Sequence, residues 1–446
     1  MVGKYHVYAK YTDSGIEWLE EIPIDWNVTR VKYASTLNPS KSHLHARPND
    51  TEVTFLPMES IGERGELVTT RVKLLKEVRS GYTYIGEGDI CIAKITPCFE
   101  NGKGAVITGL KNEIAFATTE VIPLRCLRKD DAKFLYYLLT SAPFSKVAEG
   151  SMYGAGGQKR VADSFVANYH FAMPSVFERD QIANFLDHET AKIDTLIEKQ
   201  QELIQLLKEK RQAVISHAVT KGLNPDAPMK PSGVEWLGDV PEHWVVCPLR
   251  YTLHIDNGPR LPINRSERAE MAGNYPYWGP TGVLDHLNHY RYEGERALIG
   301  EDGDHFRKFS HWPMTQWATG RFNVNNHAHV IASGKNCLAR WFFFSFLHRD
   351  IGADLIAQGV SRLKLTREGL SLLMLVVPPI EEQLMLIKHM DKATLKISQL
   401  LFNVAKQIEL LKERRTALIS AAVTGKIDVR NWQAPNPTQP EEEGST

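Results

Sequence analysis

The sequence predicts an α+β protein: two mixed α/β domains linked by two long helices that form an antiparallel coiled coil, with an internal pseudo-twofold repeat. Three observations support this prediction. A short tryptophan-containing motif occurs twice, and a long segment without Pro or Gly follows each copy at a distance. The insert between motif and segment holds short β-like runs that alternate with helical runs, which indicates a mixed domain in each half.

The repeat is visible when the chain is compared with itself. Ser14–Trp26 reads SGIEWLEEIPIDW and Ser232–Trp244 reads SGVEWLGDVPEHW, with seven of 13 positions identical. Leu206–Thr220 and Leu410–Thr424 agree at 11 of 15 positions. Because both flanks of each half repeat, we expect one frame that is present twice.

The two inserts, about Asn27–Met173 and Val245–Val377, show no comparable match to each other. This uneven divergence favours one frame that carries two different modules; drift after gene duplication is the alternative. We expect β-like runs at Val53–Leu56, Asp89–Ala93, Gly104–Ile107, Thr118–Pro123 and Ala297–Ile299, and helices at Ala132–Leu139 and Cys337–Phe346.

An apolar stripe of the coiled-coil type runs along each long segment. In Glu178–Thr220 apolar residues recur at steps of three, four or seven, and Gly222 follows as a stop signal. The second segment has the same pattern and ends before Gly425. We predict that the two stripes pair, because a lone helix cannot bury its own stripe; a layer of an ordinary helical bundle is the alternative. The predicted seam residues are Ile193, Leu196, Leu203, Leu207, Ile397, Leu400, Val404 and Leu411.

The direction of pairing is less strongly specified. An antiparallel pair relates the two halves by a pseudo-twofold axis and holds the inserts at opposite ends of a stiff spacer, whereas a parallel pair places them side by side. Gln200 has Val404 as its counterpart, so a parallel register offers no matched polar site. The pattern favours the antiparallel pair and leaves the parallel one open.

Composition indicates a globular protein of a reducing compartment. The 53 basic and 53 acidic residues exclude a uniformly basic nucleic-acid coat. Five cysteines at irregular spacings, without a CxxC step, argue against a disulfide framework and a thiolate zinc site. The first residues hold no apolar run of signal-peptide length, and no later run approaches a membrane span. We therefore expect a cytoplasmic protein.

No catalytic motif stands out. None of the four Gly-Lys steps is followed by Ser or Thr, which excludes a phosphate-binding loop, and Gly154–Gly157 lacks the GxGxxG spacing. The Pro378-Pro379 step follows Val377, so the Asn/Asp-Pro-Pro-aromatic strip of an amino-methyltransferase is absent. The clustered histidines form no HExxH, and we predict no metal site. The sequence indicates a binding protein.

Both inserts are mildly basic. The first has 19 basic and 15 acidic residues and the second 15 and 12. Such an excess suits a module that reads base edges and leaves part of the phosphate neutralisation to a partner, although ordinary charge scatter gives similar numbers. The polar loops contain side chains that can bond guanine or adenine, yet each one alone is also compatible with a solvated turn. The predicted DNA-contact residues are Lys94, Thr96, Asn101, Lys103, Tyr153, Gln158, Lys159, Tyr277, Trp278, Arg307, Asn325, Asn326, His327 and Arg362.

Over nearly its whole length, the chain resembles the specificity subunit of type I restriction–modification enzymes. The resemblance rests on the paired SGxEWLxxxPxxW motifs, on the PPIEEQ lead-in at Pro378–Gln383 and on the two LLKExR…A…IS…AVT helix ends. The first copy has an altered lead-in, with Arg179 where the distal copy has Gln383. A local contact is therefore expected to differ between the two copies.

The resemblance implies two target-recognition domains that each read one half of a split DNA site, with the paired helices setting the gap between the halves. The implied bounds are 1–173 for the first motif and recognition domain, 174–222 for the central helix, 223–377 for the second motif and recognition domain, 378–426 for the distal helix and 427–446 for an acidic tail that we expect to be flexible.

The resemblance also implies a subunit without catalysis of its own, in a system that restricts foreign DNA. Two modification subunits would carry the S-adenosylmethionine chemistry and methylate adenine at N6, and two restriction subunits would use ATP and Mg for translocation and cleavage. We expect Trp18, Trp26, Trp236 and Trp244 to contact these partners. The alternatives are a self-sufficient DNA methyltransferase or nuclease with an unrecognised motif, and a coiled-coil scaffold that never touches DNA.

Overall fold

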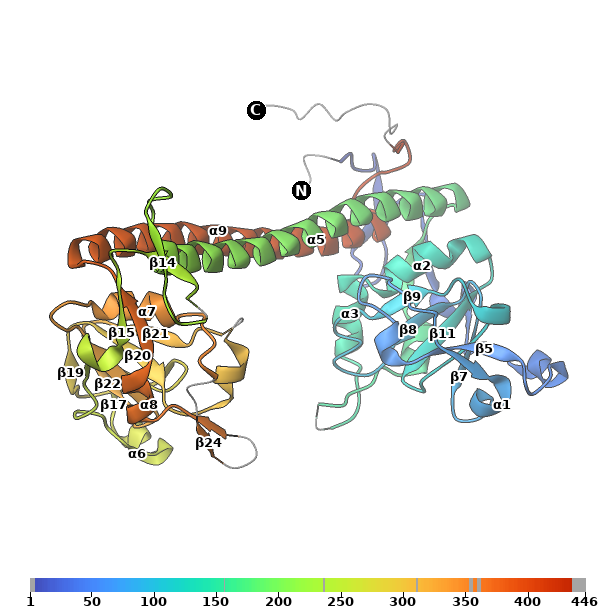
Figure 1. Ribbon diagram of the computed structural model, residues 1–446. Helices are drawn as coiled ribbons and strands as arrows, with labels where there is room; N and C mark the ends of the chain where they lie inside the picture. Colours follow the sequence, from blue (N-terminus) through green and yellow to red (C-terminus); the bar gives the residue numbers. More distant parts are fainter. Residues whose placement is uncertain are drawn as a thin grey trace. The chain divides into compact units, whose positions relative to one another are not determined.

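A computed structural model describes residues 5–155, 157–235, 237–309, 312–352, 356–358 and 362–434. The chain forms two compact units, of which the first comprises Met1–Lys199 and Lys406–Thr446 and the second Gln200–Ala405. Each unit holds one motif, one insert and one part of each long helix (Figure 1). The insert of one unit is therefore joined to helical segments that lie far apart in the sequence.

The insert of the first unit contains two four-stranded sheets. Their strand orders are β6-β5-β10-β7 and β4-β11-β8-β9, with β10 and β5 parallel and the other pairs antiparallel. The elements of this unit before the long helix are β1 (Tyr11–Asp13), β2 (Glu21–Pro23), β3 (Asn27–Arg30), β4 (Ser35–Leu37), β5 (Glu52–Leu56), β6 (Val72–Leu74), α1 (Leu75–Val78), β7 (Thr83–Gly86), β8 (Ile90–Ala93), β9 (Gly104–Val106), β10 (Ile114–Ala117), β11 (Val121–Cys126), α2 (Ala132–Leu139), α3 (Ala142–Glu149), α4 (Asp163–Asn168) and β12 (His170–Met173).

The insert of the second unit also contains two four-stranded sheets, with orders β16-β23-β20-β21 and β18-β17-β22-β19. Its elements are β13 (Met229–Pro231), β14 (Asp239–Pro241), β15 (Val245–Pro248), β16 (His254–Ile255), α6 (Arg265–Glu270), β17 (Ala272–Trp278), β18 (Val283–Leu287), β19 (Tyr292–Glu293), β20 (Arg296–Gly300), β21 (Thr315–Ala318), β22 (Arg321–Val324), β23 (Ala328–Ala332), α7 (Ala339–Phe346), β24 (Ile356–Gln358), β25 (Arg362–Lys364), α8 (Arg367–Leu372) and β26 (Met374–Val377). The expected runs match β5, β8, β9, β20, α2 and α7, whereas residues 118–120 form the turn before β11.

The two inserts share one topology although their sequences do not match. Strands β4, β11, β8 and β9 correspond in order to β16, β23, β20 and β21, and the parallel pair of β5 with β10 corresponds to that of β17 with β22. Many sequences with the same apolar pattern and volume can fill one core. The structure thus shows two different sequences on one fold, a likeness that comparison of the letters alone did not reveal.

The long helices α5 (Val176–Lys221) and α9 (Ile380–Val423) pack against each other in opposite directions (Figure 1). In the first unit, Arg415 near the end of α9 binds Asp194 in α5, with 3.1 Å between Nε and Oδ1. In the second unit, Ile215 near the end of α5 shares a core with Leu386 near the start of α9. The predicted antiparallel pairing of two long helices between mixed domains is confirmed.

Both helices end at a glycine in the left-handed conformation, as the sequence predicted. The φ angle is +73° at Gly222 and +72° at Gly425. Glycine adopts this conformation at no steric cost and closes the last helical turn. Each glycine also lets the chain pass close to a motif tryptophan, because an added Cβ would lie 3.2 Å from Trp244 Cζ2 or 3.3 Å from Trp26 Cη2.

Five of the predicted seam residues are buried or half-buried, and the other three are exposed. Ile193, Leu207, Ile397 and Val404 are buried and Leu411 is half-buried. Leu196, Leu203 and Leu400, in contrast, are 39% to 46% exposed.

The three errors have one physical cause. Leu196, Leu203 and Leu400 are each followed by a second aliphatic residue, and successive residues point about 100° apart around a helix. The structure turns the second member inward: Ile197 is buried, and Ile204 and Leu401 are half-buried. The helices therefore carry apolar side chains beyond the one stripe that the pairing needs.

The motif tryptophans have structural roles that differ from the predicted partner contact. Trp26 and Trp244 are buried where each motif packs on the end of a long helix, and Trp26 Nε1 donates to Glu178 at 3.3 Å. Trp18 is half-buried and stacks on Tyr169 with ring centroids 5.0 Å apart. Trp236 lies outside the described residues. The prediction is wrong for Trp26 and Trp244, because their large apolar rings complete the core beside the helix-ending glycines.

The segment after the second helix is partly folded, in contrast to the expected flexible tail. Ile427 and Val429 are buried, Trp432 packs edge-on against Phe185, and Asp428 bridges to the start of the chain at His6. Three apolar residues within six positions provide the reason. The acidic residues Glu441–Glu443, on which the prediction rested, lie outside the described residues.

The altered lead-in of the first copy has a direct structural counterpart. Arg179 donates to Pro174 O at 2.8 Å and to Asp131 Oδ1 at 2.7 Å, where Asp131 is the residue that precedes α2. In the distal copy, Gln383 donates to Pro378 O at 2.8 Å and accepts from the backbone N–H of Leu338, which precedes α7.

Both side chains thus join the start of a long helix to the start of a short helix in the preceding insert. The first copy makes this connection through a buried ion pair and the second through neutral amide bonds. The local contact expected from the substitution of Gln by Arg does differ, and its architectural role is retained.

Candidate nucleic-acid interface

In the first unit the fold joins the two segments that contain the predicted residues Thr96 and Lys159 at the end of β8. Thr96 accepts from the N–H of Lys159 at 3.1 Å and donates to Gly157 O at 2.6 Å. The backbone N–H of Lys94 donates to Glu120 O, and its carbonyl accepts from the N–H of Val161. The first loop cluster is defined as Lys94, Thr96, Glu120, Tyr153, Gln158, Lys159 and Arg160.

An ion pair holds this cluster together. Arg160 donates to both carboxylate oxygens of Glu120, at 2.9 and 3.0 Å, and its backbone bridges to both Ile95 and Tyr153. The hydrogen bond from Arg160 lowers the pKa of Glu120 below its ordinary value. The side chains of Tyr153, Gln158 and Lys159 are exposed above this base. The arrangement presents cationic and amide donors on a hairpin fixed at its root.

The second unit has an equivalent site at the end of β20. Glu301 takes the place of Lys94, since its N–H donates to His327 O at 2.8 Å and its carbonyl accepts from the N–H of Leu365 at 2.8 Å. Asp302 bridges to Lys364 at the end of the β24–β25 hairpin. The second loop cluster is defined as Arg260, Glu301, Asp302, Asn326, His327 and Lys364.

Glu301 is the centre of the second loop cluster. It binds Arg260 at 2.8 Å and Lys364 at 3.3 Å. Burial acts to raise the pKa of Glu301, but the hydrogen bonds from these two cations act to lower it. The net pKa lies below the ordinary value. His327 is half exposed and its Nδ1 lies 2.9 Å from Asp302 Oδ2. This site therefore offers an exposed imidazole and Asn326 where the first presents Lys159 and Gln158.

A second histidine supports the cluster from inside the fold. His329 is buried, with Nε2 2.8 Å from Leu365 O and Nδ1 2.9 Å from Asn257 Nδ2. Burial lowers the pKa of His329, which favours the neutral ring. Its two contacts tie β23 to the segments on either side of the loop cluster. Its place in the fold is structural.

Several predicted DNA-contact residues lie apart from the clusters or below the surface. Tyr277 is fully buried and donates to Leu261 O at 2.7 Å, and the buried Asn325 donates to the Tyr277 hydroxyl at 3.1 Å. These two predictions are wrong, because both side chains are buried and their polar groups form hydrogen bonds within the protein. Trp278 is half-buried against the neighbouring core and presents little of its ring.

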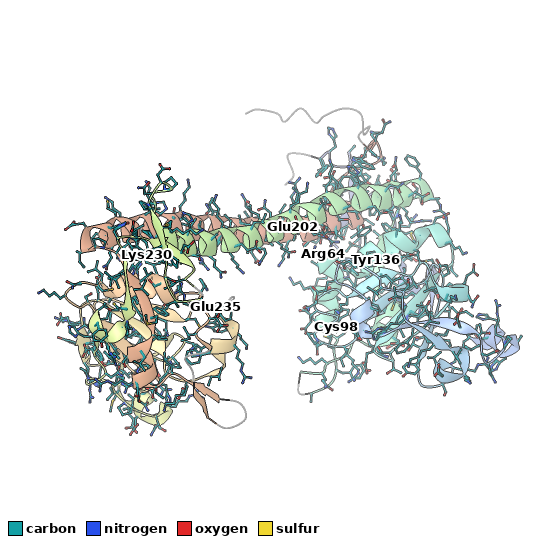
Figure 2. All side chains as sticks on the ribbon, viewed as in Figure 1. Arg64, Cys98, Tyr136, Glu202, Lys230 and Glu235 are labelled. Carbon is teal, nitrogen blue, oxygen red and sulfur yellow. The ribbon has the colours of Figure 1, made fainter. Side chains whose placement is uncertain are left out.

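Asn101 and Lys103 are bonded to the segment that contains Met58 and Glu63. Asn101 donates to Glu63 at 2.9 Å and Lys103 to Met58 O at 3.3 Å. Arg64, the neighbour of Glu63, reaches Asp194 of α5 at 3.4 Å, and Figure 2 labels Arg64 beside the helices of this unit.

Of the remaining predicted residues, Arg307 is exposed on the short helix Asp304–Lys308, which packs against β25. The backbone of Arg362 lies in β25, while its side chain is outside the described part. Sequence reasoning missed Glu120, Arg160, Arg260 and Glu301. Only Arg160 had a local signal, as a basic residue in the same glycine-rich loop.

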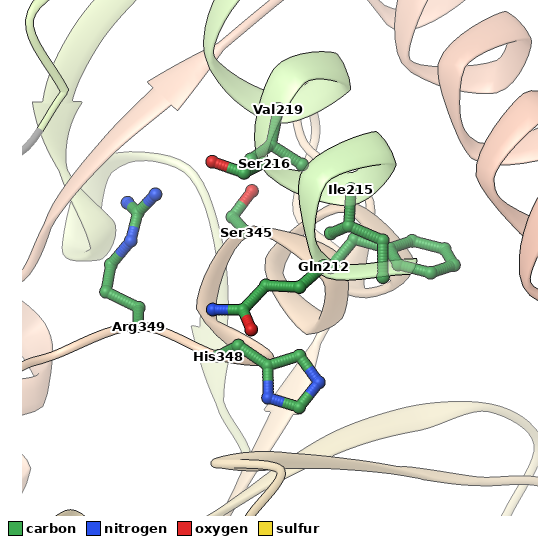
Figure 3. Close-up of a pocket in the computed structure, with 8 residues that line it drawn as sticks. Gln212, Ile215, Ser216, Val219, Ser345, His348 and Arg349 are labelled. Carbon is green, nitrogen blue, oxygen red and sulfur yellow. The ribbon is translucent and has the colours of Figure 1, made fainter. Parts of the chain in front are cut away.

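The structure also contains a small cavity in the second unit, of about 60 Å³, between the end of α5 and α7 (Figure 3). Its lining includes Gln212, Ser216, Ser345, His348 and Arg349. Burial lowers the pKa of Arg349 to about 9. None of the predicted DNA-contact residues lines this cavity, so it belongs to helix packing and not to the loop cluster.

Two features are absent from the described ranges. No group of three or more His, Cys, Asp or Glu side chains among the placed residues could hold a metal ion. In the same part of the chain, no helix is long and apolar enough to cross a membrane.

Comparison with known proteins agrees with this architecture. Residues 241–419 match the family model described as "Type I restriction modification DNA specificity domain". The EcoAI type I restriction enzyme specificity subunit of Escherichia coli is 36% identical over 164 residues, and the EcoEI specificity subunit of the same species is 33% identical over 164 residues. These matches cover 36% of this chain and 27% of either relative.

Two solved structures share the fold over most of the chain. One, described as the structural basis of complex assembly and conformational transition of the type I R-M system, aligns with a TM-score of 0.70 at 16% identity and covers 90% of this chain and 98% of that one. The HsdS subunit from Thermoanaerobacter tengcongensis aligns with a TM-score of 0.54 at 16% identity over 93% and 100% of the two chains. Residues 241–419 are therefore similar to the type I restriction–modification DNA specificity domain, and the chain spans about a quarter of the length of the two Escherichia coli specificity subunits that it matches.

Proposed function

We propose that this chain is the DNA-binding specificity subunit of a type I restriction–modification complex, in which each insert reads one half of a bipartite site. One observation carries the proposal: the same two-sheet fold occurs twice and places a polar loop cluster at the same strand end, with different side chains in each copy. Because the two loop clusters occupy equivalent places in the fold, both can bind the same DNA duplex. Because their side chains differ, they can read two different half-sites.

The chemistry of the loop clusters supports base reading. Lys159 and Gln158 in the first cluster, and Asn326 and His327 in the second, are exposed donors or acceptors at hairpins and turns. Amide side chains pair with adenine and cations with guanine in the major groove. The ion pairs of Arg160 with Glu120 and of Lys364 with Glu301 fix the base of each cluster, which reduces the entropy lost on binding.

The helix pair would set the spacing between the half-sites. Rigid linkage makes the second recognition event effectively intramolecular, provided that the spacing matches. Recognition modules on one face of DNA are favoured at centres about 34 Å apart, one helical turn. The antiparallel contacts of α5 with α9 found in each unit support this role.

The chemistry of the complex would lie in other subunits. The proposal gives S-adenosylmethionine and adenine N6 methylation to modification subunits, and ATP and Mg to restriction subunits, with two copies of each. The repeated frame supports two copies of one partner, because it offers the same surface twice.

The insert swap is the decisive experiment. Replacing Asn27–Met173 with the insert of another specificity subunit should change one half of the methylated motif and leave the other unchanged. Methylated adenines are mapped by single-molecule sequencing of cells that carry the gene and its partner genes. The original insert, returned through the same junctions, is the control. An unchanged motif would reject the proposal and favour a scaffold that never touches DNA.

A heptad insertion tests the spacing role separately. Seven residues inserted after Gln200 and seven after Val404 should alter the number of unspecified base pairs tolerated between the half-sites, with both half-sites retained. An insertion of seven residues in the exposed turn at 225–227 controls for chain length. An unchanged spacer preference in the methylation map would reject the role of the helices as a ruler.

The enzyme alternative has its own test. The purified chain is incubated with DNA, labelled S-adenosylmethionine and Mg²⁺, with and without its partner subunits. We expect methyl transfer only in the mixture with modification subunits. Transfer or cleavage by the chain alone would replace the proposal by a self-sufficient methyltransferase or nuclease.

A further inference from the structure

Each copy of the repeated frame presents an exposed cation–tyrosine pair directly after its motif. Tyr33 is 65% exposed and Tyr251 68% exposed. Lys32 Nζ lies 5.4 Å from the centroid of the Tyr33 ring, and Arg250 Cζ lies 4.9 Å from that of Tyr251. Arg250 also donates to the Tyr251 hydroxyl at 3.0 Å. Two large aromatic rings of the same kind are thus held at the surface beside a cation.

The two pairs occupy equivalent places in their units. Strand β3 pairs with β12 in the same register in which β15 pairs with β26, so that Asn27 lies opposite Met173 and Val245 opposite Val377. A short 3-10 helix follows each strand and carries the pair.

One backbone hydrogen bond fixes each of these short helices. The N–H of Val31 donates to Tyr169 O at 3.1 Å, and the N–H of Leu249 donates to Leu373 O at 2.9 Å. The structure therefore repeats the position of the cation–tyrosine pair together with the frame.

A hollow of about 520 Å³ adjoins Tyr251 in the second unit. Apolar side chains make most of its lining, among them Val245, Val377, Pro378 and Ile380. Val245 is 58% exposed.

The first unit has counterparts of this lining. Pro174, Val176 and Met173 stand at the matching positions of its lead-in, and Val176 is 48% exposed. Phe177 beside it is 60% exposed. The first unit thus also exposes apolar side chains at the start of its long helix, at positions equivalent to the lining of the hollow.

Folding alone does not account for these rings at the surface. Exposed aromatic rings contribute little to burial, and grouped exposed apolar side chains mark interaction sites. Because the two inserts differ, we expect them to bind different ligands. A surface feature that is repeated in both units is better suited to two copies of one ligand. The lining favours a protein over the DNA backbone, because an apolar hollow gains nothing from a phosphate.

We propose that Tyr33 with Lys32, and Tyr251 with Arg250, are the anchors of two equivalent docking sites for two copies of one protein partner. Each site takes an apolar side chain of the partner beside the tyrosine, within the hollow in the second unit and against Val176 and Phe177 in the first, with a carboxylate of the partner against the cation. The inference rests on the proposed function, in which this partner is the modification subunit. It replaces Trp26 and Trp244, which the core buries, as the surface that the partner reads.

The test measures how many modification subunits the full-length chain binds. Native mass spectrometry and titration calorimetry are applied to the wild type, to Tyr33→Ala, to Tyr251→Ala and to the double variant. We expect two copies on the wild type, one copy on each single variant with the second weakened at least about tenfold, and both weakened on the double variant. Lys32→Glu and Arg250→Glu should weaken the same copy as the neighbouring tyrosine variant.

Trp312→Ala removes an aromatic ring that is 46% exposed outside these sites and serves as the matched control, with unchanged binding expected. Circular dichroism checks that every variant is folded. Two full-affinity copies on the double variant would overturn the docking sites and leave the proposed function in place. A wild-type chain that binds no modification subunit would overturn both.

Discussion

The buried ion pair between Arg179 and Asp131 allows a sharp test of how the long helix is anchored to the first insert. Their side chains are 10% and 7% exposed, and Arg179 Nε lies 2.7 Å from Asp131 Oδ1. Arg179→Ala removes this contact and the bond to Pro174 O. Removal of one member of a buried pair costs about 3–5 kcal/mol, because the other charge stays buried.

The expected value is near the lower end of that range. Arg128 Nη1 lies 3.1 Å from Asp131 and is one-third exposed, so it compensates part of the charge that Arg179 leaves behind. We expect Arg179→Ala to lower the free energy of unfolding of the first unit by about 3 kcal/mol. Arg179→Gln, which places the side chain of the distal copy here, should have an intermediate effect, since its amide can still donate to the carboxylate.

The assay is urea unfolding combined with hydrogen exchange of the backbone amides in α2, which report on the first unit alone. Lys133→Ala is the matched control, because the Lys133–Asp187 pair also joins α2 to α5 but is 56% and 37% exposed. Such an exposed pair contributes about 1 kcal/mol or less. The reasoning is refuted if Arg179→Ala destabilises the unit no more than Lys133→Ala does.

Three further predictions concern separate parts of the chain. Gly425→Ala should destabilise the first unit by about 1–3 kcal/mol in urea unfolding, because its φ is positive and the new Cβ would lie 2.5 Å from Pro23 Cδ; a change below about 0.5 kcal/mol would contradict it. Because Arg160 lowers the pKa of folded Glu120, their pair contributes stability above the unfolded pKa of Glu120 and loses it as pH falls through the lower folded value. The protection factors for hydrogen exchange at 153–160, which correct for the slower intrinsic exchange in acid, should therefore fall, and Glu120→Gln should remove this pH dependence. Burial raises the pKa of the Cys91 thiol, so alkylation mapped by mass spectrometry should spare Cys91 in the native chain and label it after denaturation; native labelling would contradict the burial.

The loop clusters show where prediction from sequence ended. The glycine-rich loop at 154–160 and the turn after Ala93 were both predicted from turn residues and polar side chains, and the fold brings them together through Thr96. Glu120, the ion-pair partner of Arg160, had no local signal, and neither did Arg260 in the second loop cluster. A salt bridge between residues 40 apart depends on sheet register, which no single loop encodes.

Exposure also decided which predicted residues are free to bind. Tyr277 and Asn325 have suitable side chains for base contact, yet the sheet turns them inward, where each satisfies a hydrogen bond. One-residue alternation in a strand places neighbours on opposite faces, so a small error in strand position reverses the prediction. The same uncertainty, on a helix, exchanged Leu196 for Ile197 in the seam.

The sequence by itself determined the repeat, the two long helices, their glycine ends and the mixed character of the inserts, because these depend on local periodicity and on residues with restricted backbone conformation. Only the tertiary structure decided that two dissimilar inserts share one topology and that Trp26 and Trp244 are buried against the helix ends. It also decided that Arg179 binds the carboxylate of Asp131 to make the connection that Gln383 makes in the distal copy. Those outcomes depend on packing between segments that are distant in the chain. Many sequences without detectable similarity can pack into the same core.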